Sequence, residues 1–172
     1  YGAFSGCSSL TSIALPDSVT SIGDGAFSGC SSLTSITLPD GLTSIGGEAF
    51  SDCRSLTSIT LPDSVTSIVD KAFSDCRSLT SITLPDGLTS IGNWAFFDCE
   101  KLTGITDIVI PDGLTSIGYG TFFRCETLTS VILSEGVAAV GEGAFADCQK
   151  LAHLEVRNEK CKFGKEPFGE TF

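Results

Sequence analysis

The sequence predicts a repeat solenoid, a right-handed superhelix with short parallel strands on one side of every coil and short helical or 3₁₀ turns on the other. Phenylalanine and cysteine each recur seven times at an interval of 23 residues, with one longer step of 26. Each copy also holds a short run in which polar and apolar residues alternate. A period of about 20 to 50 residues is typical of stacked repeats. The two files are Phe4, Phe27, Phe50, Phe73, Phe96, Phe122 and Phe145, and Cys7, Cys30, Cys53, Cys76, Cys99, Cys125 and Cys148.

The first element of a coil is a strand, as the standard copy at residues 30–53 illustrates. Its stretch "SITL" alternates polar and apolar residues, which is the pattern of a strand with one buried face. We expect Ile36 and Leu38 to point into the core and Ser35 and Thr37 to point outward.

The strand should end at Pro39, Asp40 and Gly41. Proline has no N–H for a ladder, aspartate bonds the backbone of a turn, and glycine accepts a positive φ. A second extended piece then carries Leu42 and Ile45.

After the second piece, Gly46 turns the chain again. The remaining stretch, residues 48–53, is long enough only for a single helical or 3₁₀ turn that leads to the next strand. One such coil buries too little apolar surface to fold alone, so neighbouring coils must stack and pair their strands in a parallel ladder.

The repeats predict one solenoid domain followed by a short closing segment. Residues 1–156 form seven coils, of which the first is truncated, and residues 157–172 form a degenerate partial repeat. Phe168 still lies 23 residues after Phe145, whereas charges multiply between them. We expect this last segment to be a polar cap or the start of a linker. Because the sequence begins inside a repeat, we expect it to be part of a longer protein.

The stretch "LTSITLPDGL" at residues 33–42 resembles the leucine-rich repeat. With the following "IG..AF..C", the phrase is similar to the BspA-like repeats of surface proteins in bacteria and some protozoan parasites, over residues 3 to 156. The resemblance implies a secreted or surface-anchored, non-enzymatic binding protein, an adhesin for host proteins. The usual asparagine position departs from that pattern, since it holds Ser18, Gly41, Ser64, Gly87, Gly113 and Gly136.

Composition restricts the partners. Acidic residues outnumber basic ones by 21 to 10, which disfavours nucleic acid. No apolar run approaches a transmembrane length, so we expect no direct membrane insertion. The family resemblance implies a protein ligand, such as a host extracellular-matrix or plasma protein, and an extracellular or cell-surface location.

The eight cysteines allow several interpretations. An extracellular chain can form disulfides, and adjacent coils bring equivalent positions close together. We favour small apolar core residues, because a regular interval fits packing and seven members of one file cannot all pair. Cys161 lies out of register and is expected either to pair with Cys148 or to be free. Zinc is disfavoured because there is no CxxC and only one histidine.

No catalytic, cofactor or metal site is expected. The aspartates that follow each proline form a file that could bind calcium, yet turn formation explains them better. The single histidine, His153, has no partner set that the sequence identifies as catalytic. The file is Asp17, Asp40, Asp63, Asp86 and Asp112.

Aromatic residues accumulate in copies five and six, beside a three-residue insertion between Leu102 and Pro111. Either they fill a gap that the insertion makes, or they form an exposed patch of the kind that anchors interfaces. The candidate partner-binding residues here are Trp94, Phe97, Tyr119, Phe123 and Arg124.

The outward strand positions change along the chain. In the first four copies they are Ser12 and Ala14, Ser35 and Thr37, Ser58 and Thr60, and Ser81 and Thr83. They then become Asp107 and Val109, Ser130 and Ile132, and His153 and Glu155. Val109, Ile132 and His153 are therefore further candidates for partner binding.

Two alternatives to protein binding remain. The chain could be a passive spacer or stalk of a larger surface protein. The hydroxyl ladder of the first copies could instead bind ice or another crystal surface.

Overall fold

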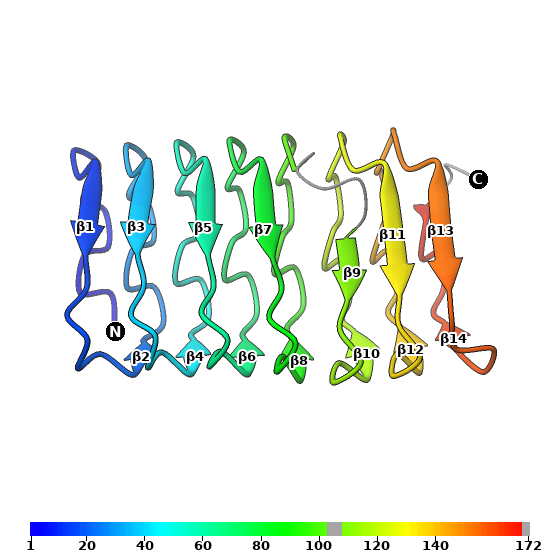
Figure 1. Cartoon of the computed structure of the whole chain (residues 1–172). Coiled ribbons are helices and arrows are strands. Elements are labelled where there is room, and N and C mark those ends of the chain that lie inside the picture. Colours follow the sequence, from blue (N-terminus) through cyan, green and yellow to red (C-terminus); the bar gives the residue numbers. More distant parts are fainter. Residues whose placement is uncertain (103–107, 170–172) are drawn as a thin grey trace.

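The computed structural model describes residues 1–102 and 108–169, and it confirms the repeat solenoid. Each coil holds an odd-numbered strand, an even-numbered strand and a run of turns, and the coils stand side by side in one row (Figure 1). The odd-numbered strands are β1 (Ser12–Ala14), β3 (Ser35–Thr37), β5 (Ser58–Thr60), β7 (Ser81–Thr83), β9 (Ile108–Ile110), β11 (Ser130–Leu133) and β13 (His153–Val156). The even-numbered strands are β2 (Ser21–Ile22), β4 (Ser44–Ile45), β6 (Ser67–Ile68), β8 (Ser90–Ile91), β10 (Ser116–Ile117), β12 (Ala139–Val140) and β14 (Lys162–Phe163).

The odd-numbered strands follow the predicted alternation. In β3, Ile36 is buried between exposed Ser35 and Thr37. All pairings are parallel, and Ile13 lies opposite Ile36, one repeat later. The strands pair within the groups β1-β3, β5-β7 and β9-β11-β13. β3 and β5 are also neighbours, since Thr57 N donates to Thr34 O at 3.4 Å just before the two strands.

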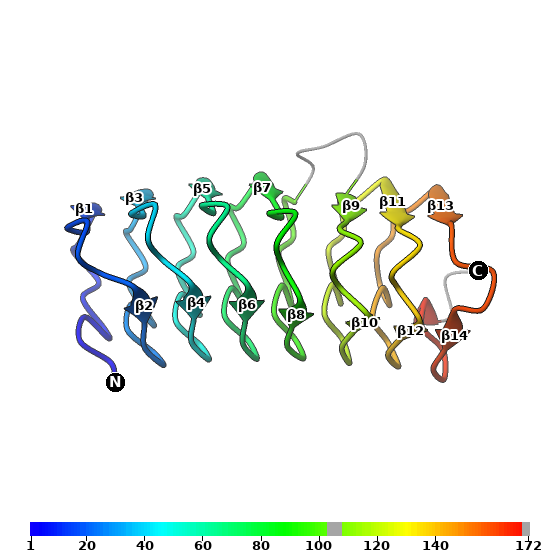
Figure 2. The same cartoon turned by 60° about the horizontal axis from the view of Figure 1, so that its bottom comes forward.

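The even-numbered strands form one sheet of seven, which runs from β2 to β14 (Figure 2). The sequence predicts an extended piece here, but the continuous ladder goes beyond that prediction. The sequence feature that could have indicated this second ladder is the tetrad Leu-Thr-Ser-Ile, which occurs twice in a standard copy, at residues 33–36 and 42–45. In the second tetrad, the Thr43 hydroxyl donates to the carbonyl of Thr20 at 3.1 Å, and the first tetrad repeats that bond between Thr34 and Thr11 at 3.0 Å.

The expected single helical or 3₁₀ turn in each coil is instead a run of separate turns. Cys53 N donates to Phe50 O at 3.2 Å and Ser51 N to Glu48 O at 3.1 Å, whereas Phe50 N donates to Ala72 O of the next coil at 2.8 Å. Glu48 and Asp52 have φ values of 56° and 60°. Two left-handed residues four positions apart prevent a helix. Alternate N–H groups, those of Glu48, Phe50 and Asp52, then donate to the next coil and create a third ladder.

The described part of the chain contains no helix that is long and apolar enough to cross a membrane.

The phenylalanine file forms the centre of the core. Phe50, Phe73 and Phe96 are fully buried, and their rings stack at centroid distances of 5.3 Å and 5.4 Å. The contribution of offset aromatic stacking adds to that of the buried area. Phe4, in the first coil, has a ring neighbour on one side and is 38% exposed.

The cysteine file lies beside the phenylalanine file, and all eight cysteines are free. The Cys76 thiol is fully buried and donates to the carbonyl of Phe50 at 3.2 Å. The same bond, at 3.1 to 3.3 Å, recurs for Cys30, Cys53, Cys99, Cys125 and Cys148. This geometry supports the packing interpretation, because each of these six thiols has a defined core contact.

The residues at the position that is usually asparagine contact the preceding coil in two ways. The Ser64 hydroxyl lies 2.6 Å from the carbonyl oxygens of both Asp40 and Leu42 in the preceding coil. At the glycine positions the backbone itself approaches the preceding coil. A Cβ on Gly87 would lie 3.3 Å from Asp63 O.

Residues 157–169 continue the ladders. β14 pairs in parallel with β12, and Phe168 stacks on Phe145 at 5.9 Å. Pro167 O accepts the Phe145 N–H at 2.7 Å. The partial repeat thus covers the last full coil up to residue 169.

Candidate functional site

The turn runs carry three files of residues outside the phenylalanine core, and these files change character along the solenoid. The positions lie two residues before, one residue after and two residues after each core phenylalanine. Around Phe27 they hold Gly25, Ser28 and Gly29, whereas around Phe96 they hold Trp94, Phe97 and Asp98. We call this surface the turn face.

Four aromatic side chains from coils five and six gather on the turn face. Trp94 contacts Tyr119, Phe97 and Phe123 with ring centroids 4.7 Å, 5.2 Å and 5.7 Å apart, all edge-on. Phe97 and Phe123 stack at 5.6 Å. Tyr119 is 42% exposed and the other three are half-buried. The aromatic cluster, Trp94, Phe97, Tyr119 and Phe123, therefore packs on itself at the surface, outside the buried phenylalanine file.

Local backbone features allow this arrangement. Trp94 has a φ of 58° and Gly120 a φ of 57°. A Cβ on Gly120 would collide with the indole of Trp94, so glycine leaves the space that the ring occupies. The Asn93 side-chain oxygen accepts the Tyr119 N–H at 2.8 Å and fixes the adjacent backbone.

Sequence reasoning missed the supporting roles of Asn93 and Gly120. A signal was present, because Asp24 and Asp70 occupy the repeat position of Asn93. Their carboxylates accept the N–H of Gly47 and Asn93 at 2.8 Å and 2.7 Å.

A hollow lies on each side of the aromatic cluster. The first, of about 490 Å³, has serines along its floor and ends at Trp94 and Phe97. The second, of about 340 Å³, lies toward the carboxyl-terminal end and is bounded by Tyr119 and Phe123. The charged residues that line this second hollow are Glu142, Asp147 and Glu166.

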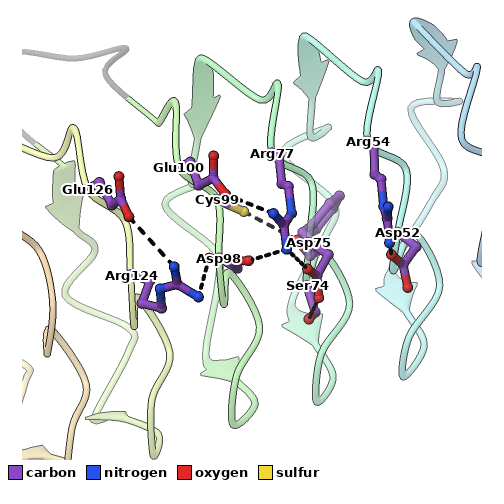
Figure 3. Close-up of polar contacts among 11 residues, drawn as sticks. Asp52, Arg54, Ser74, Asp75, Arg77, Asp98, Cys99, Glu100, Arg124 and Glu126 are labelled. Carbon is purple, nitrogen blue, oxygen red and sulfur yellow. Dashed lines mark hydrogen bonds and ion pairs between the residues drawn. The ribbon is translucent and has the colours of Figure 1, made fainter.

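Arg124 lies in an ion-pair network at one edge of the turn face (Figure 3). Its guanidinium lies 3.5 Å from Asp98 Oδ1 and 3.8 Å from Glu126, and Arg77 reaches Asp98 Oδ2 at 2.6 Å. The Asp98 side chain is 2% exposed. Burial raises the pKa of its carboxyl, although Arg124 and Arg77 act in the opposite direction. The network links coils four, five and six, so Arg124 is engaged within the protein.

The remaining candidates lie on another surface, the odd-numbered strands. Val109 is 48% exposed and lies opposite Ile132 in the pairing of β9 with β11. His153 is exposed and lies opposite Ser130, which is buried although its pattern predicts an outward side chain. The structure thus separates the candidates into an aromatic group and a strand group. Asp107 and most of the inserted stretch lie outside the described residues.

The sequence model described as "BspA type Leucine rich repeat region", with six copies, matches residues 1–106 and 103–171. The chain belongs to the BspA-type leucine-rich repeat family. A comparison with curated proteins finds no match.

Two solved structures extend the family resemblance to three dimensions. One is a leucine-rich repeat protein of T. pallidum, with 36% identity over 90% of this chain and 73% of that chain and a TM-score of 0.83. The other is a leucine-rich repeat protein of Bacteroides ovatus ATCC 8483, with 25% identity over 99% of this chain and 67% of that chain and a TM-score of 0.51.

The aspartate file of this BspA-type solenoid lies exposed along the turns after the odd-numbered strands. A backbone bond closes the standard turn, since Leu42 N donates to Pro39 O at 3.0 Å. Within residues 1–102 and 108–169, no three metal-binding side chains come close enough to hold an ion.

Proposed function

We propose that this BspA-type solenoid is a non-enzymatic protein-binding module of a secreted or cell-surface protein, and that it acts in adhesion to host or matrix proteins. The aromatic cluster is its principal contact. Family membership supports the general role, and the four clustered aromatics carry the choice of surface. Aromatic side chains supply large contact areas and dominate many interface hot spots.

The solenoid suits this role because it presents the cluster on a rigid support. Two hydrogen-bond ladders run along the coils, one through the even-numbered strands and one through the turn runs, and the odd-numbered strands add pairs within their three groups. A rigid surface loses little conformational entropy when a partner binds. Trp94 is held further by Gly120, whose missing side chain leaves room for the indole.

Two double variants test the choice of surface. Trp94→Ser with Phe123→Ser should abolish binding to host cells or to immobilised matrix proteins, with little change in melting temperature. Val109→Ser with Ile132→Ser removes apolar area from the strand face and is the matched control, which should bind normally. Loss of binding only in the control would refute the assignment. A large drop in melting temperature for the first variant would instead show that the cluster acts in packing.

A passive spacer is the second candidate function. The even-numbered strands form one continuous sheet of seven, as expected for a stiff support. A spacer predicts that this chain binds no host protein while a longer protein containing it does.

Binding to ice remains a further hypothesis. The later coils count against it, because Val109, Ile132 and His153 take the outward positions that hold hydroxyls in the first coils. A thermal hysteresis measurement that shows no activity would eliminate it.

A further inference from the structure

The two hollows beside the aromatic cluster differ in their charge. In the first hollow, the carboxylates are compensated by basic groups at short range. Lys71 lies 3.8 Å from Glu48, Arg54 lies 2.8 Å from Asp52, and Arg77 lies 3.1 Å from Asp75.

All the charged residues that line the second hollow are acidic. Glu142, Asp147 and Glu166 line it, and none of them forms an ion pair within the described residues. Tyr119 and Phe123 line the same hollow, so aromatic rings and uncompensated carboxylates face one space of about 340 Å³. Tyr119 is 42% exposed, which leaves much of it open to a ligand.

This combination suits a cation. Ammonium and guanidinium groups are attracted to the faces of aromatic rings, and nearby carboxylates add charge attraction. An anionic ligand would face three carboxylates on a chain of formal charge −11. A neutral apolar ligand would leave those carboxylates desolvated without a partner, which is unfavourable.

We propose that this second hollow receives lysine or arginine side chains of a protein partner, while Trp94 and Phe97 contact apolar atoms next to them. The assignment rests on the proposed protein-binding function and specifies the chemistry of the partner. The negative charge of the whole chain also steers a basic partner toward the surface, whereas the hollow determines where its cation binds.

The test uses short synthetic peptides and the fluorescence of Trp94, the single tryptophan of the chain. Because Trp94 contacts Tyr119 and Phe123, which line the hollow, its emission reports occupation of that space. One peptide carries four lysines or arginines around an apolar residue, and its partner has the lysines acetylated or the arginines replaced by citrulline. Only the basic peptide should change the emission, and its affinity should fall as salt is raised.

Matched triple variants locate the effect. Neutralising the hollow with Glu142→Gln, Asp147→Asn and Glu166→Gln should weaken binding of the basic peptide by at least about tenfold. The control neutralises three exposed aspartates of the turns after the odd-numbered strands and should change affinity by less than about twofold. Its substitutions are Asp40→Asn, Asp63→Asn and Asp86→Asn. Circular dichroism verifies that both variants are folded.

Several results would overturn the assignment. Equal weakening by both triple variants would mean general charge attraction, and equal binding of basic and neutralised peptides would exclude a cation site. A neutral oligosaccharide that gives the same Trp94 response would indicate another ligand class. If Trp94→Ser with Phe123→Ser removes host-protein binding while the hollow variant does not, protein binding stands and the cation site falls.

Discussion

The cysteine file gives the sharpest prediction for the folded chain, because thiol reactivity depends on both access and pKa. Burial raises the pKa of the Cys53 thiol from its ordinary value of 9.0 to about 12. It has the same effect on Cys148, whose pKa is also raised to about 12. At pH 8, a rise of that size lowers the thiolate fraction by about a thousandfold, and the thiolate is the reactive form.

The assay is titration of the native and the denatured chain with a thiol-specific disulfide reagent at pH 8, without reductant. The exposed Cys7 should react at once and the half-buried Cys161 more slowly. The six buried thiols should react only when the chain unfolds. A Cys7→Ser variant should lose the fast phase and nothing else.

Two outcomes would refute the reasoning. Fewer than eight reactive thiols after denaturation would show that disulfides form in the file. Rapid reaction of several buried thiols in the native chain would show that the thiol-to-carbonyl contacts are not maintained, and the packing role of the file would fall with them.

Three further predictions concern stability, the first two measured by urea unfolding and the third by thermal unfolding. Phe73→Ala should lower the free energy of unfolding by about 3 to 5 kcal/mol, because the ring is buried between two stacked neighbours. Phe4→Ala, at the exposed end, should lower it by less than about 2 kcal/mol. Equal losses for the two variants would contradict a continuous core. Because folding raises the pKa of Asp98, the native state binds the extra proton and that contribution to stability falls as pH rises above 3.8. Lowering the pH from 7 to 3 should therefore raise the free energy of unfolding of the wild type relative to that of Asp98→Asn. A relative change in favour of the variant would contradict the burial argument. Deleting residues 157–172 should expose Phe145 and lower the melting temperature, as expected if that segment is a cap; no change would favour a linker.

The repeat interval predicted much of this fold. Every pairing within the first four coils joins residues 23 apart, such as Ser44 with Ser67, because hydrogen-bonded neighbours occupy the same position in successive copies. The buried residues could also be predicted from the sequence, since Ile36 and Phe50 occupy apolar positions of the repeat and are buried. The turn runs were predicted incorrectly because Glu48 and Asp52, in the copy used as the standard, adopt left-handed conformations without being glycine. The signal lies in another copy, where Gly25 and Gly29 hold the same two positions with positive φ.

The candidate site was predicted only as a set of residues. Phe97 and Phe123 were recognised from composition, but their contact with Trp94 depends on its left-handed backbone and on the space at Gly120. Arg124 was grouped with the aromatics because it follows Phe123, yet its side chain reaches the buried carboxylate of Asp98.

By itself, the sequence determined the repeat, the inward positions and the parallel stacking, because a short coil can bury its apolar side chains only against identical neighbours. The tertiary structure decided which outward residues share a surface and which charges remain uncompensated. Those outcomes depend on distances between coils and on side-chain directions. Glu48 and Glu142 both belong to acidic turn segments, but within the described residues only Glu48 forms an ion pair, with Lys71 of the next coil.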